Sequence, residues 1–161
     1  MRKDGVSVAR ITLLAAAVRL LGLDAKGFWE DEASTVLLLK EDLGRMLAGV
    51  ADGERAPYLY YLLAWPWTRL FGDGEVGLRS LSVLFGAATV PVAYLAAREL
   101  ISRRAGVVVA ALVATNPILV WYSQEGRTYA LFVLLSALAL YFFARALRDP
   151  SPRCLALWAL A

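Results

Sequence analysis

Histidine is absent from the 161 residues, and cysteine occurs only once, at Cys154. The missing imidazoles remove the commonest metal ligand from this chain, and a lone thiol excludes an internal disulfide. Charged residues are also scarce, at 19% against about 25% in an average soluble protein, whereas 60% of the residues are apolar. This balance excludes an ordinary soluble domain.

Clustered positive charge of the kind that binds nucleic acid is also lacking. The net charge is only +3, and the isoelectric point is near 9.2. No segment combines a basic patch with exposed aromatic side chains in a soluble context, so we predict no nucleic-acid partner.

Apolar residues are instead gathered into three runs that are nearly free of charge, at Leu81–Ala97, Val107–Trp121 and Ala130–Ala144. A helix needs about 20 apolar residues to cross the hydrocarbon core. The last apolar run, Leu155–Ala161, is too short, so we interpret the chain as the N-terminal part of a longer protein. We predict an all-α polytopic membrane protein with spans at about 8–23, 78–100, 105–122 and 128–147, another starting at 154, and an outer loop at 24–76.

The first apolar stretch, Ile11–Leu23, follows the basic residues Arg2, Lys3 and Arg10. A cleaved signal peptide has the same layout and is an alternative interpretation. We favour a transmembrane helix that enters from the cytoplasm, because further membrane segments follow at once and Arg19 is unsuited to a signal core.

The stretch Pro57–Phe71 is apolar but has only 15 residues, contains Pro66 and is rich in tyrosine and tryptophan. Its length and aromatic residues predict a helix at the membrane interface and not a span. With this topology, arginines such as Arg98, Arg103 and Arg104 share the cytoplasmic side with the N-terminus, as the positive-inside tendency requires.

Within the predicted outer loop, apolar residues recur at helical spacing from Val36 to Val50. They are Val36, Leu39, Leu43, Met46, Leu47 and Val50, and charged residues fall largely between them. This pattern predicts one amphipathic helix lying on the membrane surface.

Charged residues from separate segments meet on the outer side of this topology. They are Glu30, Asp31 and Glu32, then Glu54 and Arg55, then Arg79, and finally Glu125 and Arg127 beside Gln124. Arginines bind phosphate in two-pronged fashion, a carboxylate can accept a proton from a hydroxyl, and carboxylates can hold a divalent cation. The pattern indicates a site for an anionic lipid head group. Two alternative functions are a non-catalytic transporter or assembly subunit, and a binding module that catalyses no reaction.

Four segments, in order, carry a resemblance to a known family. They are Phe28–Ala33 (FWEDEA), Glu54–Leu63 (ERAPYLYYLL), Leu70–Ser82 (LFGDGEVGLRSLS) and Tyr122–Leu131 (YSQEGRTYAL). Together they resemble the start of a family 39 integral membrane glycosyltransferase of the GT-C fold, a group that includes protein mannosyltransferases and lipid A aminoarabinose transferases.

The resemblance implies site roles for several residues. Asp31 and Glu32 match the family's catalytic Asp-Glu pair, with Asp31 as base, while Arg55 and Arg127 would bind the donor phosphate. Glu54 would bind a divalent metal, and Glu125 and Arg79 are further candidates. The implied reaction moves a sugar, with inversion, from a polyprenyl-phosphate donor to a hydroxyl of a lipid, glycan or protein acceptor. It would take place on the extracytoplasmic face of the plasma (inner) membrane, with the N-terminus in the cytoplasm.

Overall fold

The computed structural model describes residues 2–54 and 57–160, with side chains from residue 6 onward except that of Glu54. All regular secondary structure in this part of the chain is helical, which confirms the predicted all-α class. The order is α1 (Arg2–Leu20), α2 (Glu30–Lys40), α3 (Leu43–Gly49), a π-helical turn η1 (Val50–Glu54), α4 (Tyr58–Phe71), α5 (Glu75–Leu100), α6 (Arg103–Thr115), α7 (Pro117–Ser123), α8 (Tyr129–Arg148) and α9 (Pro152–Leu160).

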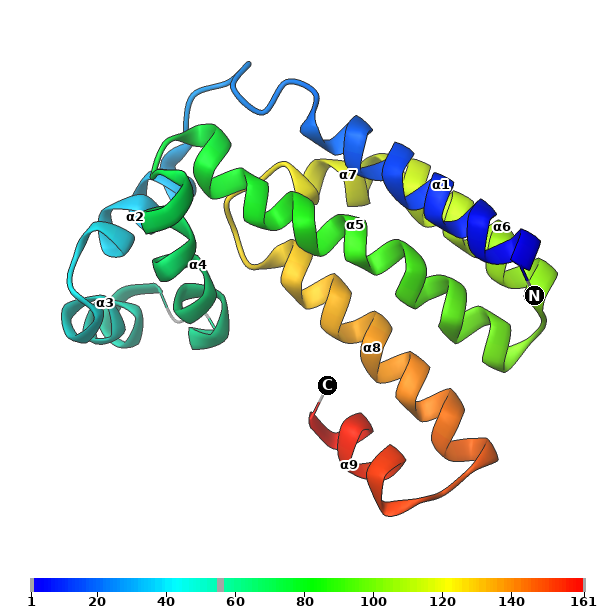
Figure 1. Cartoon of the computed structure of the whole chain (residues 1–161). Coiled ribbons are helices and arrows are strands. Elements are labelled where there is room, and N and C mark those ends of the chain that lie inside the picture. The colour runs from blue at the N-terminus through cyan, green and yellow to red at the C-terminus, as the bar shows by residue number, and fades with distance from the viewer. Residues whose placement is uncertain (1, 55–56, 161) are drawn as a thin grey trace.

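Helix α5 is the axis of the molecule, with α1 and α6 along one side and α8 along the other (Figure 1). Helices α5 and α8 run in the same direction, whereas α1 and α6 run in the opposite one. An ion pair of 3.1 Å between Arg148 and Glu99 joins the C-terminal ends of α8 and α5. The arginine-rich helix ends therefore share one end of the bundle with the N-terminus, as the charge pattern predicts.

Two helices are long and apolar enough to cross a membrane, α5 and α8, and the pair α6 and α7 is a third candidate span. This pair occupies the segment predicted as the span over 105–122, and it bends by 59° at the break between the two helices. Proline at 117 disfavours helical geometry at Asn116, whose side chain instead accepts bonds from the backbone N–H groups of Ile118 and Leu119. The bend thus starts a new, capped helix.

Helix α1 occupies the segment predicted as the first span but carries five ionisable residues and is not among the candidate spans. Its Arg19 is fully buried. The guanidinium donates to the carbonyl oxygens of Val113 and Ala114, at 3.0 and 2.9 Å, and to the hydroxyl of Ser123. These carbonyls belong to the last turn of α6, where a cation is favourable. Arg19 therefore holds α1 against the bend between α6 and α7.

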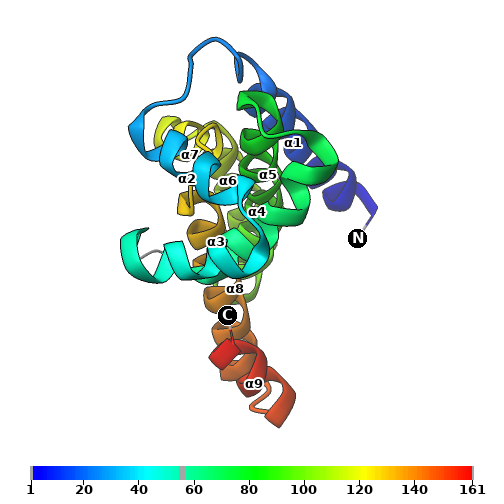
Figure 2. The same ribbon diagram turned by 90° about the vertical axis from the view of Figure 1, so that its left-hand side faces the viewer.

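Helices α2, α3 and α4 lie together at the end of the bundle where α5 begins, and in Figure 2 they stand in front of the long helices. The prediction of one continuous helix from Val36 to Val50 is wrong. Glu41 and Asp42 are extended, and the Asp42 carboxylate caps α3 through the N–H of Arg45. Asp42 therefore starts a new helix, and the segment forms two short helices although its apolar residues recur at helical spacing.

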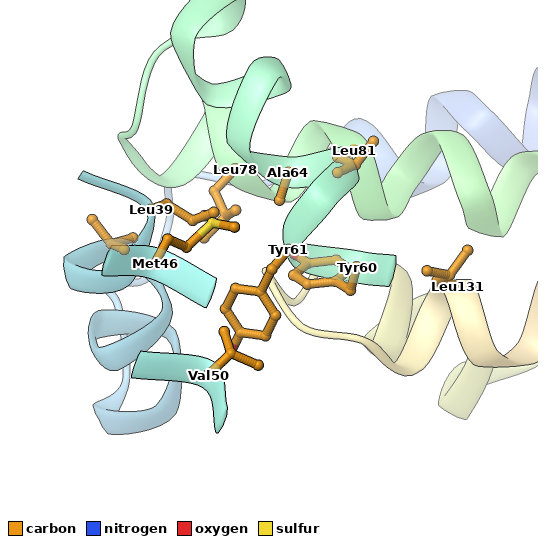
Figure 3. Close-up of a cluster of buried hydrophobic side chains, with 10 residues drawn as sticks. Leu39, Met46, Val50, Tyr60, Tyr61, Ala64, Leu78, Leu81 and Leu131 are labelled. Atoms are coloured by element: carbon orange, nitrogen blue, oxygen red, sulfur yellow. The ribbon is translucent and has the colours of Figure 1, made fainter. Parts of the chain in front are cut away.

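Most of the apolar side of that segment is nevertheless buried within the protein. Figure 3 shows the cluster in which α2, α3 and η1 meet α4, α5 and α8. Its buried members are Val36, Leu39, Met46, Val50, Tyr60, Tyr61, Ala64, Leu78, Leu81 and Leu131. Four of the six residues of the predicted apolar face are among them, whereas Leu43 is 41% exposed. Most of the face that the sequence assigned to a membrane surface therefore packs against a protein core.

Helix α4 has 14 residues and so is about 21 Å long, less than the roughly 30 Å of a hydrocarbon core. The helix is not among the candidate spans, and its interface position stays a prediction. Arg69 donates to the carbonyl oxygens of Leu39 and Glu41, at 3.2 and 2.9 Å, and the indole of Trp65 donates to Glu41 as well. Side chains of α4 therefore anchor it on the C-terminal end of α2.

We expect Arg19→Met to lower the thermal midpoint of unfolding in detergent, because carbonyls at the end of α6 lose a charged donor. The loss should correspond to about 1.5–3 kcal/mol, the range for hydrogen bonds to charged groups. Arg10→Met is the matched control, since Arg10 is exposed on the same helix. Equal midpoints for the two variants would contradict the role given to Arg19.

Candidate functional site

A buried ion pair joins the start of α2 to the start of α5. Both oxygens of the Glu32 carboxylate accept from Arg79, at 2.9 Å from Nε and 2.6 Å from Nη2. The Glu32 side chain is fully buried, and that of Arg79 is 6% exposed. A buried pair is stable only with two-pronged geometry and further hydrogen bonds, and both conditions are met here.

A third bond to Glu32 comes from the loop before α8. The backbone N–H of Gly126 donates to the same carboxylate at 2.7 Å. A Cβ at this position would collide with the side chain of Leu78, so glycine is needed for the loop to approach so closely. Burial alone raises the pKa of Glu32, but the bonds from Arg79 and Gly126 outweigh it and hold this pKa below its ordinary value. Glu32 is therefore a charged residue that holds α2 against α5 and against the loop before α8.

Arg79 also shapes the loop between α1 and α2. Its terminal nitrogens donate to the carbonyl oxygens of Leu23, Lys26 and Gly27, and its guanidinium lies 5.4 Å from the ring centre of Phe28. One side chain thus satisfies a carboxylate and three carbonyl groups from segments some 50 residues earlier. This network fixes the position of the first turn of α2, which carries Asp31.

Asp31 lies one residue before Glu32 and is half-buried. Its backbone carbonyl accepts from Nη1 of Arg127 at 3.1 Å, and the same nitrogen donates to the hydroxyl of Thr35 at 2.8 Å. No hydrogen bond or ion pair involves the Asp31 carboxylate within the described residues. The predicted base and a predicted phosphate ligand are therefore neighbours, held together through the backbone.

Glu125 is half-buried and accepts a short hydrogen bond from the indole nitrogen of Trp121. Burial raises its pKa above the ordinary value, and the nearby charge of Glu32 adds to the effect, while Trp121, Arg127 and Arg79 oppose it. The surroundings therefore raise the pKa of Glu125 and lower that of Glu32, although the two acids belong to one site.

A pocket of about 470 Å³ opens beside the Glu32–Arg79 pair. The loop before α2 forms one wall, and the end of α7 with the following loop forms another. The lining residues are Gly22, Ala25, Lys26, Gly27, Trp29, Glu32, Arg79, Trp121, Gln124 and Glu125. Neither Asp31 nor Arg127 is among these residues, although Glu32, the neighbour of Asp31, is.

The structure gathers five of the predicted site residues at the end of the bundle where α5 begins: Asp31, Glu32, Arg79, Glu125 and Arg127. Arg55 and the side chain of Glu54 lie outside the described part of the chain. Within that part, three or more carboxylate or thiol groups nowhere converge as a metal site. Glu32 is bound to Arg79 and Gly126, so its own carboxylate is already engaged.

Sequence reasoning missed several residues of this region. Thr35 links Arg127 to α2, and Lys26, Trp29 and Trp121 line the pocket. Trp29 and Trp121 each lie close to predicted acids, which is a signal that could have placed them at the site. The sequence offers no signal for Thr35, whose role depends on a contact across 92 positions.

One family model, described as dolichyl-phosphate-mannose-protein mannosyltransferase, matches residues 55–161, about two thirds of the chain. No curated protein and no solved structure matches. The matched range contains Arg79, Glu125 and Arg127 but begins after Asp31 and Glu32. The match therefore rests on the segments from α4 onward and is independent of the acidic motif in α2.

We expect Glu32→Gln to destabilise the protein by about 3–5 kcal/mol, because it leaves the buried guanidinium of Arg79 without its counter-charge. Since the folded-state pKa of Glu32 is lowered, its contribution is present above the ordinary pKa of 4.5 and is lost as pH falls through the lowered value. Thermal melts in detergent from neutral to acidic pH measure both effects.

The control for this variant is Glu30→Gln, which removes an exposed carboxylate from the same helical turn. It should leave the midpoint almost unchanged. The role of the ion pair would be contradicted by a Glu32→Gln protein that melts like this control at neutral pH.

Proposed function

Because this chain belongs to the dolichyl-phosphate-mannose-protein mannosyltransferase family, a family of GT-C glycosyltransferases, we propose that it transfers a sugar from a polyprenyl-phosphate donor to an acceptor hydroxyl. Arg127, within the matched range, lies against the backbone of Asp31 at 3.1 Å. This neighbourhood is the observation that carries the proposal, because the reaction needs a base and a cation on either side of the anomeric carbon.

In the proposed reaction, the Asp31 carboxylate accepts the proton of the acceptor hydroxyl as its oxygen attacks the anomeric carbon. The bond between that carbon and the phosphate oxygen breaks, and the lipid phosphate leaves with the electron pair. Attack opposite the leaving group inverts the anomeric centre. The guanidinium of Arg127, joined by that of Arg55, stabilises the negative charge on the departing phosphate.

Glu32 and Arg79 are positioning residues in this mechanism. Their bonds fix the first turn of α2 and the loop at Gly126, on which Asp31 and Arg127 are carried. A divalent cation at Glu54 stays a prediction, and no step of the mechanism is routed through it. The sugar is a hexose or a pentose, and the acceptor is a lipid, glycan or protein.

The proposed site lies on the extracytoplasmic side of the plasma (inner) membrane. The arginine-rich helix ends lie at the opposite end of the bundle, beside the N-terminus, and positive residues favour the cytoplasmic side. Charge segregation between the two ends of α5 supports this orientation.

We expect Asp31→Asn to lower turnover by roughly 10²–10⁴-fold, because the amide cannot accept the proton of the acceptor. Donor binding should persist, since the amide keeps the shape of the carboxylate. The assay is transfer from polyprenyl-phosphate mannose in proteoliposomes containing the product of the full reading frame, with donor affinity measured separately. Glu30→Gln is the matched control. Near wild-type turnover of Asp31→Asn would exclude Asp31 as the base.

Orientation is tested by cysteine labelling in a Cys154→Ser background. A cysteine at the exposed Ser102, between α5 and α6, should be protected from an impermeant thiol reagent in intact cells, whereas one at the exposed Ala51 should react. Both should react once the membrane is permeabilised. Labelling of position 102 from outside would reverse the proposed topology.

A further inference from the structure

Thr35 lies on the side of α2 that faces the protein core. Its side chain is fully buried, and the nearby Val36 and Leu39 belong to the apolar cluster of Figure 3. Valine has nearly the same shape as threonine and would bury no polar group at this position. A hydroxyl in such surroundings is costly unless it is hydrogen-bonded. The partners of this hydroxyl therefore indicate why threonine occupies the position.

Asp31, Thr35 and Arg127 form a closed set of three hydrogen bonds. Oγ1 of Thr35 donates its single hydrogen to the backbone carbonyl of Asp31 at 3.0 Å. The same oxygen accepts from Nη1 of Arg127 at 2.8 Å, because a guanidinium can only donate. Nη1 also donates to the Asp31 carbonyl, at 3.1 Å. One hydroxyl thus joins the residue proposed as the base to the arginine proposed to bind phosphate.

The bond from Thr35 to the carbonyl four residues earlier is common in helices and by itself indicates no function. Thr89 on α5 is 3% exposed and makes the same kind of bond, at 2.9 Å. What distinguishes Thr35 is the second bond, from an arginine 92 positions away. Ser123 accepts from Arg19 in a similar way, and that contact holds helices together. A structural role and a functional role for Thr35 must therefore be separated by experiment.

The two bonds from Arg127 to α2 fix the direction of its guanidinium. Both start at Nη1, and a planar group held by two acceptors at one nitrogen cannot turn freely about either bond. Without the Thr35 hydroxyl, Nη1 keeps only the Asp31 carbonyl among these two acceptors, and the group can pivot about that bond. A displacement of about 1 Å in a positioned group can lower a rate on the order of 10²-fold.

We propose that Thr35 is a positioning residue, whose hydroxyl holds the guanidinium of Arg127 in one place relative to Asp31. This role rests on the proposed function, in which Arg127 stabilises the charge on the leaving phosphate. That charge is larger in the transition state than in the bound donor. A misplaced guanidinium therefore lowers turnover more than it lowers donor affinity.

Thr35→Val tests this role, because valine keeps the shape of threonine but has no hydroxyl. We measure transfer from polyprenyl-phosphate mannose by the product of the full reading frame in proteoliposomes. We expect kcat to fall roughly tenfold, while the dissociation constant of the donor changes by less than about threefold. Thr35→Ser keeps the hydroxyl and should turn over almost like the wild type.

The matched control is Thr89→Val, which removes an equally buried hydroxyl with the same bond inside a helix. Among the described residues, no arginine donates to Thr89. This variant should keep the kcat of the wild type. Thermal melts in detergent and gel filtration establish that each variant is folded, and Thr35→Ala carries the same comparison if Thr35→Val does not fold.

A double-mutant cycle with Arg127→Ala shows whether Thr35 acts through that arginine. If it does, adding Thr35→Val to Arg127→Ala lowers kcat no further, because no guanidinium is left to hold. A threonine that only supports the packing of α2 would lower kcat by the same factor with and without Arg127.

The wild-type protein separates a failure of this role from a failure of the proposed function. A wild-type protein that transfers no sugar overturns the proposed function, and the role of Thr35 falls with it. If the wild type does transfer sugar, two results overturn the positioning role alone. One is a Thr35→Val protein with the kcat of Thr89→Val, and the other is a loss of kcat that is equally large in the Arg127→Ala background.

Discussion

The buried pair of Glu32 and Arg79 is the contact on which the arrangement of this end of the molecule depends. It is the point where α2, α5, the loop after α1 and the loop before α8 meet. Removing two charges from water is costly, and the cost is offset only when every donor and acceptor is engaged. Here both carboxylate oxygens and all the guanidinium nitrogens have partners. The pair therefore fixes one geometry and disfavours slightly shifted ones.

Arginine serves a second purpose in this fold, as a donor to carbonyl groups where helices end. Arg19 does so at the end of α6, and Arg69 does so at the end of α2. The last four carbonyls of a helix lack partners within it, and in an apolar setting water is scarce. A guanidinium has five donors in a planar fork, so one arginine can satisfy several carbonyls and complement the helix dipole. Charge scarcity in the sequence thus makes individual arginines structurally important.

Much of this fold follows from local sequence. Long apolar runs predict α5 and α8, and the short Pro66-containing stretch predicts a helix that does not span. Helical periodicity misleads where a capping residue interrupts it, because Asp42 divides the predicted amphipathic helix into two. A cap at Asn116, before Pro117, likewise bends the segment predicted as the span over 105–122, which periodicity did not indicate. Periodicity carries no information about such local competition.

The site is less accessible to sequence reasoning than the fold. The sequence predicts that acidic and basic residues from separate segments lie at one membrane level. Five of those residues do meet at one end of the bundle. Which charge pairs with which is decided by distance in space: Glu32 binds Arg79 across 47 positions, whereas Arg127 binds the backbone of Asp31. Spacing along the chain therefore indicates the region of the site but not the division between anchors and reactive groups.

The contacts of Arg19 have a consequence for how the protein is assembled. Its partners, near Val113, Ala114 and Ser123, are synthesised about 100 residues after it, and Gln124 returns a bond to the carbonyl of Arg19 itself. While the chain is being made, the guanidinium of Arg19 therefore lacks these native partners until α6 and α7 have been synthesised. The native contacts of Arg19 therefore form only after α6 and α7 exist, although α1 is synthesised first.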